Sequence, residues 1–349
     1  MLANELSRRG HEITVVSWDE HEASSFYPLD AGIAWLQLGF SPGLWDKFRR
    51  TWALFRALRQ VRPAVFVGFV MGADKSVYLA NLLARVPIIA AERNAPDMYG
   101  HRFSPLKRWF YLSLLGLCRR VLIQLEQYRL GYPRSVRTKI RVIENPVAPP
   151  RLMAHPARRS SIQPILLTVG RLDPQKNFDV LIRAFALLRD QFPEWRLRIV
   201  GEGGERRRLK QLVDSLDLAA RVELPGATSA IEEEYAAAHL FALPSRWEGF
   251  PNALAEALTH GLPAVGFAGC PGVNALIQPE VNGLLAEGLD NSANLADALS
   301  RLMADDTLRE GMGKAAVLSM ERFAPAEIFD RWENVLLEAA SEGACHAKK

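Results

Sequence analysis

Short runs of β-branched and apolar residues alternate with helix-like patterns from one end of the chain to the other. This alternation is typical of βαβ units, in which parallel strands are joined by helices that cover both faces of a sheet. The chain is therefore predicted to be an α/β protein. Its predicted strands are residues 12–17, 33–38, 64–70, 87–91 and 121–124 in the first part and 165–169, 196–200, 222–224, 240–243, 264–267 and 283–286 in the second.

Residues 141–150 form the predicted boundary between two domains. A strand pattern there runs into a proline-rich stretch, where regular structure ends. The 349 residues are enough for two domains of about 100 to 200 residues each. This division predicts an architecture of two α/β halves that meet across a cleft. Because ligands of such sheets bind at the carboxyl ends of the strands, the loops after the strands are the candidate binding segments.

Composition and cysteine usage narrow the class of protein. With 49% hydrophobic and 23% charged residues, the composition is that of a globular chain rather than a disordered or fibrous one. Cys118, Cys270 and Cys345 are too scattered for a disulfide framework or a zinc site, which fits a reducing cytoplasm. No apolar run approaches the roughly 18 residues of a membrane span, and residues 1–9 are typical of an amphipathic helix rather than a signal peptide.

Charge is divided unevenly along the chain. Residues 1–150 hold 21 Lys+Arg against 12 Asp+Glu, a net +9, whereas residues 151–349 hold 22 against 27, a net −5. A basic half fits nucleic acid, anionic lipid or a phosphorylated small molecule. Residues 106–112 set cations beside aromatic rings, as a membrane-surface helix does, although a packed helix with a cationic flank explains them about as well. No nucleic-acid-binding motif occurs, and the charge division favours contact with an anionic membrane.

The loop after the predicted strand 165–169 has the residues of a phosphate clamp. Gly170 ends the strand, and Arg171 and Lys176 precede a helix that Asn177 is predicted to cap. Arginine offers a rigid fork of donors, lysine a mobile charge, and the helix N-terminus a partial positive charge. Two ordinary surface cations on a solvated loop are the alternative, and they are favoured if this loop is considered by itself.

A second polar loop follows the predicted strand 240–243 and leads into a helix. Glu248 lies in this loop and Glu256 lies about a turn and a half into the helix, so the two carboxylates come from different elements. Each glutamate alone is more simply a solvated side chain, but the pair supports a site. Backbone N–H groups between the two carboxylates could bind an anion. The candidate residues of this segment are Glu248, Gly249, Phe250, Pro251, Asn252 and Glu256.

The spacing of Glu248 and Glu256 resembles the E-x7-E pattern of retaining glycosyltransferases with the GT-B fold, particularly family 4. Residues 91–96, Ala-Glu-Arg-Asn-Ala-Pro, are similar to a segment of the subgroup that builds capsular and exopolysaccharide repeat units. The resemblance covers about residues 2–340. Residues 169–177 resemble the family's diphosphate-binding segment, and residues 199–206 resemble its next strand and turn. Residues 222–226 resemble its nucleobase-side loop, and residues 281–285 resemble the segment after the donor site.

The resemblance implies an architecture of two Rossmann-like domains facing across a cleft. Residues 1–150 would form the acceptor-side domain and residues 151–322 the nucleotide-sugar-binding domain. A C-terminal helix and tail, residues 323–349, would pack back toward the first domain. Members of the family begin with a strand and a glycine-rich loop before the helix that here starts at Met1, so this first strand and loop are expected to be missing.

The resemblance also implies the reaction. A hexose or N-acetylhexosamine would pass with retention from a nucleotide-diphosphate sugar, expected to be a UDP-sugar, to a polyprenyl-diphosphate-linked or oligosaccharide acceptor in surface polysaccharide biosynthesis. Arg171 and Lys176 would neutralise the diphosphate, Glu256 would accept hydrogen bonds from the ribose, and Glu248 would contact the donor sugar; Glu248, Arg171 and Lys176 are the candidate catalytic residues. No metal-ligand cluster occurs in the sequence, so transfer without a metal cofactor is expected.

On the acceptor side, the resemblance implies Glu92, Arg93 and Asn94, which follow the predicted strand 87–91. A strand-end loop held by local hydrogen bonds is an equal alternative for these three residues. The expected location is the cytoplasm, peripherally on the inner face of the plasma membrane, with no nucleic acid partner. Two other functions stay open: a nucleotide-sugar epimerase on the same fold, and a chain that binds the nucleotide without turnover.

Overall fold

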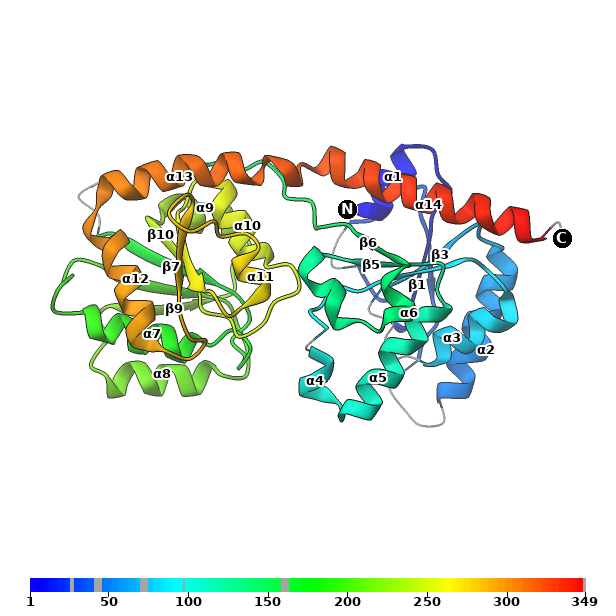
Figure 1. Cartoon of the computed structure of the whole chain (residues 1–349), viewed down its shortest axis with the longest axis horizontal. Helices are drawn as coiled ribbons and strands as arrows, with labels where there is room; N and C mark the ends of the chain where they lie inside the picture. Colours follow the sequence, from blue (N-terminus) through cyan, green and yellow to red (C-terminus); the bar gives the residue numbers. More distant parts are fainter. Residues whose placement is uncertain (26–27, 41–45, 70–74, 97, 158–162, 348–349) are drawn as a thin grey trace. The chain divides into compact units, whose positions relative to one another are not determined.

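The chain folds into two compact units (Figure 1). The structure is a computed structural model, and it describes residues 1–25, 28–40, 46–69, 75–96, 98–157 and 163–347. One unit combines Met1–Glu144 with Ala326–Lys349, and the other is Asn145–Pro325. The first unit is therefore assembled from both ends of the chain, and the second from a single continuous segment.

The chain enters the second unit a few residues before the predicted boundary at residue 150. Asn145 donates from Nδ2 to Oδ1 of Asn252 at 2.7 Å. The Val147 N–H donates to the Phe323 carbonyl at 2.9 Å. These bonds attach the segment that follows Glu144 to the second unit, so the boundary lies between Glu144 and Asn145.

The second unit is built on a parallel sheet of six strands in the order β12-β11-β10-β7-β8-β9. Four of its strands, β7, β10, β11 and β12, are largely apolar and buried along most of their length, as expected where helices cover both faces of a parallel sheet. The order reverses between β7 and β10, which places the loops after these two strands next to each other. The strands are β7 (Ile165–Val169), β8 (Arg196–Val200), β9 (Val222–Gly226), β10 (Leu240–Leu243), β11 (Ala264–Phe267) and β12 (Gly283–Ala286).

Helices complete the βαβ units of this sheet. Amphipathic α7 buries Phe178, Leu181 and Phe185 among other apolar residues, and it packs against α12, which Asn291 caps by accepting from the Ala293 and Asn294 N–H groups. The helical elements of the unit are α7 (Phe178–Leu188), α8 (Arg206–Ser215), α9 (Ile231–Ala237), α10 (Asn252–Thr259), α11 (Pro271–Asn274), α12 (Ser292–Ala304), α13 (Asp306–Met320) and the 3-10 turn η3 (Glu321–Phe323).

The first unit has two parallel sheets among its described residues. A two-stranded sheet pairs β1 (Thr14–Ser17) with β2 (Ala34–Gln37). The other has the order β3-β4-β5-β6, with β3 (Phe66–Phe69), β4 (Ile88–Ala91), β5 (Arg120–Ile123) and β6 (Ile140–Val142). The helical elements are α1 (Leu2–Arg8), α2 (Asp46–Val61), α3 (Lys75–Ala84), α4 (Met98–Arg102), α5 (Pro105–Leu114), η1 (Leu115–Leu117), η2 (Glu126–Gly131) and α6 (Arg134–Arg137).

The last helix, α14 (Pro325–Ala347), completes the core of the first unit. Ile328, Trp332, Val335 and Ala339 recur at helical spacing and lie on one face of α14. They form a buried cluster with four residues that belong to or follow strands of the β3–β6 sheet, namely Ile89, Ala91, Leu122 and Ile143. The predicted α/β class with two Rossmann-like units is confirmed. None of the helices in the described ranges is long and apolar enough to cross a membrane.

Candidate functional site

Two consecutive residues after β7, Pro174 and Gln175, are bonded to two consecutive residues after β10, Arg246 and Trp247. The side chain of Gln175 donates to the Trp247 carbonyl at 2.7 Å, and the Arg246 N–H donates to the Gln175 carbonyl at 2.9 Å. Arg246 also donates through Nη1 to the Pro174 carbonyl at 2.5 Å. These bonds hold the two loops in one register at the switch point of the sheet, where ligands of open α/β sheets bind.

The next pair along these loops is Lys176 and Glu248. Lys176 Nζ lies 2.7 Å from Glu248 Oε1, and the two side chains are only 14% and 6% exposed. Burying two charges is favourable only when they compensate each other, so each side chain holds the other in place. The structure therefore brings two of the predicted site residues, 72 positions apart in sequence, into direct contact.

Arg171 and Gly170 begin the loop on the other side of Lys176. The Arg171 side chain is 78% exposed and pairs with Asp173 at 3.3 Å, so its guanidinium is held close to the loop but remains in solvent. Gly170 lies against the Lys176 side chain, because a Cβ at this position would be 3.1 Å from Lys176 Cε. The loop thus presents one largely buried and one exposed cation.

Glycines after β8 allow the neighbouring turn to approach this loop closely. A Cβ at Gly201, where φ is +146°, would lie 1.9 Å from the Gly170 carbonyl oxygen, and one at Gly203 would lie 2.3 Å from that of Leu172. Side chains at these two positions would push the β8 turn away from the β7 loop. Residues 201–204 therefore form a tight turn beside the candidate site.

Asn177 does not cap α7 as the sequence predicts. It occupies the N-cap position, but its backbone is left-handed with φ 57°, and no side-chain cap bond forms. Its Nδ2 instead donates to the Leu289 carbonyl at 2.9 Å, and the side chain is fully buried. Asn177 therefore ties the candidate site to the segment that follows β12.

Glu256 lies on α10 behind the loop and is held by Tyr235 of α9. The Tyr235 hydroxyl donates to Glu256 Oε2 at 2.9 Å, and the Ala253 carbonyl at 3.2 Å is the other acceptor in reach of that proton. Burial raises the pKa of Glu256 above its ordinary value, and the hydrogen bond from Tyr235 partly offsets this rise. The ring of His260 packs on Tyr235 with 4.8 Å between centroids, and burial lowers the pKa of this histidine.

The remaining predicted residues of this segment connect the two glutamates. Pro251 immediately precedes α10, as its missing N–H predicts. Phe250 is buried edge-to-face against Phe323 at 5.3 Å, Gly249 is half-buried, and Asn252 is exposed at the first position of the helix. Glu248, the 249–252 turn and Glu256 thus form one continuous segment after β10.

The three predicted acceptor-side residues lie in the first unit, after β4. Glu92 is 1% exposed and accepts a hydrogen bond from the Tyr99 hydroxyl at 2.7 Å. The guanidinium of Arg93 stacks on the ring of Trp332 at 5.0 Å, and burial lowers the pKa of Arg93 to about 10. Asn94 is half-buried. Glu92 and Arg93 thus have structural contacts within this unit, and an acceptor role for the three residues stays a prediction.

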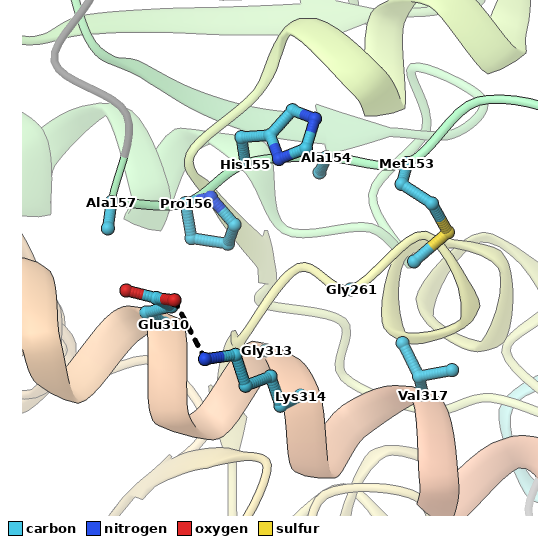
Figure 2. A pocket seen from close by; sticks show the side chains of 10 residues that line it. All are labelled: Met153, Ala154, His155, Pro156, Ala157, Gly261, Glu310, Gly313, Lys314 and Val317. Atoms are coloured by element: carbon cyan, nitrogen blue, oxygen red, sulfur yellow. Dashed lines mark ion pairs between the residues drawn. The ribbon is translucent and has the colours of Figure 1, made fainter.

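A cavity of about 470 Å³ lies elsewhere on the second unit (Figure 2). It is lined by the segment from Met153 to Ala157, by Gly261 and by one face of α13, where Glu310 and Lys314 form an ion pair at 2.8 Å. None of the predicted site residues lines it. The arrangement of Lys176, Glu248 and Glu256, and not this cavity, is therefore the candidate functional site.

In the part of the chain that the structure describes, no group of three or more His, Cys, Asp or Glu side chains could hold a metal ion. Cys118 and Cys270 are buried, and burial raises the pKa of each thiol to about 12. At neutral pH both thiols are therefore protonated and poor nucleophiles.

Three residues of the site were not identified from the sequence. Gln175 and Arg246 lie inside the two loops already singled out, and their role depends on cross-loop bonds that spacing does not reveal. Tyr235 lies on a separate helix, 21 positions before its partner Glu256, and no motif marks it. The signal that finds Tyr235 is the packing of α9 beside α10.

Comparisons with known proteins cover nearly the whole chain. Residues 1–146 match the family model described as "Glycosyl transferase 4-like domain", and residues 156–318 match the one described as "Glycosyl transferases group 1". The amylovoran biosynthesis glycosyltransferase AmsD of Erwinia amylovora is 26% identical over 96% of this chain and 93% of its own. An α-1,4-N-acetyl-D-galactosaminyltransferase of Campylobacter jejuni, named for an undecaprenol-diphosphate-linked acceptor, is 24% identical over 97% and 93%.

Solved structures show the same fold. A sucrose-phosphate synthase from Thermosynechococcus elongatus superposes with a TM-score of 0.82 at 19% identity, over 98% of this chain and 92% of its own. Anabaena HepE, solved with UDP and glucose, superposes with a TM-score of 0.72 at 19% identity, over 87% and 85%. At this level of identity the similarity establishes the GT-B architecture.

Proposed function

The chain belongs to the glycosyltransferases with a 4-like first domain and a group 1 second domain, and from this we propose that it is a retaining enzyme that uses a UDP-sugar. It would transfer a hexose or N-acetylhexosamine to a lipid-linked or oligosaccharide acceptor in surface polysaccharide biosynthesis. The observation that carries the proposal is the largely buried pair of Lys176 and Glu248 at the switch point of the second unit's sheet.

The proposed chemistry follows from the charges at that point. As the bond from the anomeric carbon to the diphosphate breaks, negative charge develops on the leaving nucleoside diphosphate. Lys176, already removed from water, and Arg171 would stabilise this charge, since preorganised cations need little rearrangement during the reaction. Glu248 would accept hydrogen bonds from the donor sugar, and the acceptor hydroxyl would form its bond on the face that the diphosphate leaves, with loss of the hydroxyl proton.

Support for the two substrates comes from relatives. The Campylobacter relative is named for an undecaprenol-diphosphate-linked acceptor, and the Erwinia relative for synthesis of the polysaccharide amylovoran. HepE was solved with UDP. We propose the same classes of donor and acceptor for this chain. A lipid-linked acceptor would require the enzyme to work at a membrane surface.

The proposal is tested by incubating the protein with a panel of labelled UDP-sugars and a polyprenyl-lipid extract, with and without EDTA. We expect label in the lipid phase for one donor, and a rate that EDTA changes by less than about twofold, because the chain supplies its own cations to the diphosphate. An epimerised donor, or UDP binding without turnover on any lipid or oligosaccharide tested, would overturn the proposed transfer. Loss of the rate in EDTA would overturn its metal independence.

Tyr235→Phe tests the proposed role of Glu256 through pH. The ionised carboxylate accepts hydrogen bonds from ribose, so UDP affinity should fall as pH drops through the raised pKa of Glu256. Removing the Tyr235 hydroxyl takes away the interaction that lowers this pKa, and the fall should begin at a higher pH. Calorimetric titration of UDP over roughly pH 5 to 8 measures the midpoint.

Two comparisons accompany that titration. Tyr132→Phe changes another buried tyrosine, in the first unit, and should leave the midpoint unchanged. Because the folded second unit binds a proton on Glu256 more tightly than the unfolded chain does, its stability should decrease as pH rises from the ordinary to the raised pKa. Identical midpoints in Tyr235→Phe and the parent would contradict a ribose-binding role for ionised Glu256.

A further inference from the structure

Helices α2, α3 and α5 of the first unit leave large apolar side chains in solvent. Phe48 is 84% exposed and Leu106 is 77% exposed, which is unusual for residues that normally drive burial. Together these side chains make up what we call the apolar face: Phe48 and Trp52 on α2, Leu79, Leu82 and Leu83 on α3, and Leu106, Trp109 and Phe110 on α5. Exposed apolar side chains gathered on neighbouring helices mark an interaction site.

The exposed side chains form stripes along their helices. On α2, Phe48 and Trp52 are four residues apart, while Leu54 and Leu58 are buried on the other side. On α3, Leu79 and Leu83 are also four residues apart, and Val77 is buried. Residues four apart lie on the same side of a helix, so each helix has an inner stripe in the core and an outer apolar stripe.

The helices that carry these outer stripes lie on one side of the first unit. Helices α2 and α3 pack together, and Figure 1 shows α2, α3 and α5 on the side of the first unit's strands away from α14. The Nζ of Lys75, at the start of α3, lies 5.2 Å from the ring centroid of Phe110 and 5.7 Å from that of Tyr111 on α5. The start of α3 therefore lies beside Phe110 of the α5 stripe.

Positive charge accompanies the apolar face. From Phe48 to its end, α2 has four arginines and no acidic residue; Arg56 and Arg59 are exposed. Lys75 is the only charged residue of α3, and Lys107 and Arg108 are the only ones of α5. A protein partner would have to match the shape of three helices. An anionic lipid surface instead offers an apolar interior and negatively charged headgroups, which the apolar side chains and the cations of this face complement.

We propose that the apolar face of α2, α3 and α5 binds the surface of an anionic lipid bilayer, with Trp52 and Trp109 entering the headgroup region and the flanking cations contacting lipid phosphates. The sequence pattern at residues 106–112 indicated one such helix, and the structure adds α2 and α3 to the same surface. Lipid binding requires no sugar transfer, so its test is independent of the proposed reaction.

The test is sedimentation of the full chain with vesicles of phosphatidylglycerol and phosphatidylethanolamine, and with vesicles of phosphatidylcholine alone. We expect binding to the anionic vesicles that weakens by about tenfold or more in high salt. Trp52→Ser with Trp109→Ser should lower the partition coefficient by about tenfold or more, as should Arg56→Gln with Lys107→Gln. Leu187→Ser with Leu318→Ser, which changes exposed leucines of the second unit, is the matched control and should bind as the parent does.

The side chains changed in these variants are exposed, and circular dichroism of each variant checks that the fold is retained. Quenching of tryptophan fluorescence by brominated anionic lipid, reduced in Trp109→Phe, would support entry of this side chain. Failure of the parent to bind anionic vesicles at low salt, or equal binding by parent and face variants, would overturn the proposal. Self-association that the face variants abolish, without vesicle binding, would show that the face is a protein interface instead.

Discussion

Lys176→Ala is expected to lower kcat by about 10²- to 10³-fold and to weaken binding of UDP. Lys176 is one of two cations of the β7 loop and the one removed from water, with its Nζ 2.7 Å from Glu248. Its loss would leave the Glu248 carboxylate, 6% exposed, beside the proposed diphosphate site without that compensation. The effect should therefore exceed that of losing a surface charge.

Glu248→Gln separates the two roles within the pair. Glutamine keeps the shape of the side chain and loses its charge, so Lys176 remains available to the diphosphate. UDP affinity should stay within a few-fold of the parent or increase, while kcat should fall by about 10²-fold, because the proposed contact with the donor sugar is weakened. The two variants are thus expected to differ in UDP binding and to agree in loss of turnover.

Arg301→Ala provides the comparison for both variants. Arg301 pairs with Glu280 at 2.9 Å, but both side chains are more than half exposed, and such pairs contribute little. Initial rates and UDP calorimetry on the three variants test the expected effects on turnover and on UDP binding. Thermal unfolding checks that the second unit stays folded. Parent-like turnover in Lys176→Ala, with the fold intact, would remove this lysine from the proposed catalytic residues.

The loops of the candidate site were largely predictable, because their chemistry lies in contiguous segments. Gly170 to Asn177 and Glu248 to Glu256 each follow an apolar strand, and the reversal of strand order places them together. The bond from Tyr235 to Glu256 could not be predicted, since it depends on how α9 packs beside α10. The prediction that Asn177 caps α7 was wrong. Its backbone is left-handed, and its side chain bonds instead to Leu289, 112 positions away in sequence.

The acceptor-side segment shows a different limit of sequence reasoning. A loop after a strand was correctly expected at Glu92 and Arg93, but the burial of these side chains depends on Tyr99 and Trp332. Trp332 comes from a helix near the other end of the chain. Periodicity identifies such a helix and its apolar face, whereas the strands against which it packs are a property of the folded unit.

Trp332→Ala is expected to destabilise the first unit by about 3 to 5 kcal/mol. Trp332 is 2% exposed and belongs to the buried cluster that joins α14 to β4 and β5. Its ring also carries the guanidinium of Arg93 at 5.0 Å and contacts the ring of Phe69 at 6.1 Å. Truncation to alanine removes all of these contacts together. It also leaves a cavity where α14, from the C-terminal part of the chain, packs on strands of the N-terminal part.

Trp195→Ala is the matched control, because Trp195 has an equivalent environment in the second unit. It is 1% exposed and carries the guanidinium of Arg309 at 5.1 Å. Two units with separate cores should melt as two transitions in calorimetry, with Trp332→Ala lowering one of them and Trp195→Ala the other. UDP should protect the transition lowered by Trp195→Ala, since the candidate donor residues belong to the second unit. A single transition lowered equally by both variants would instead show that the two cores unfold as one cooperative body.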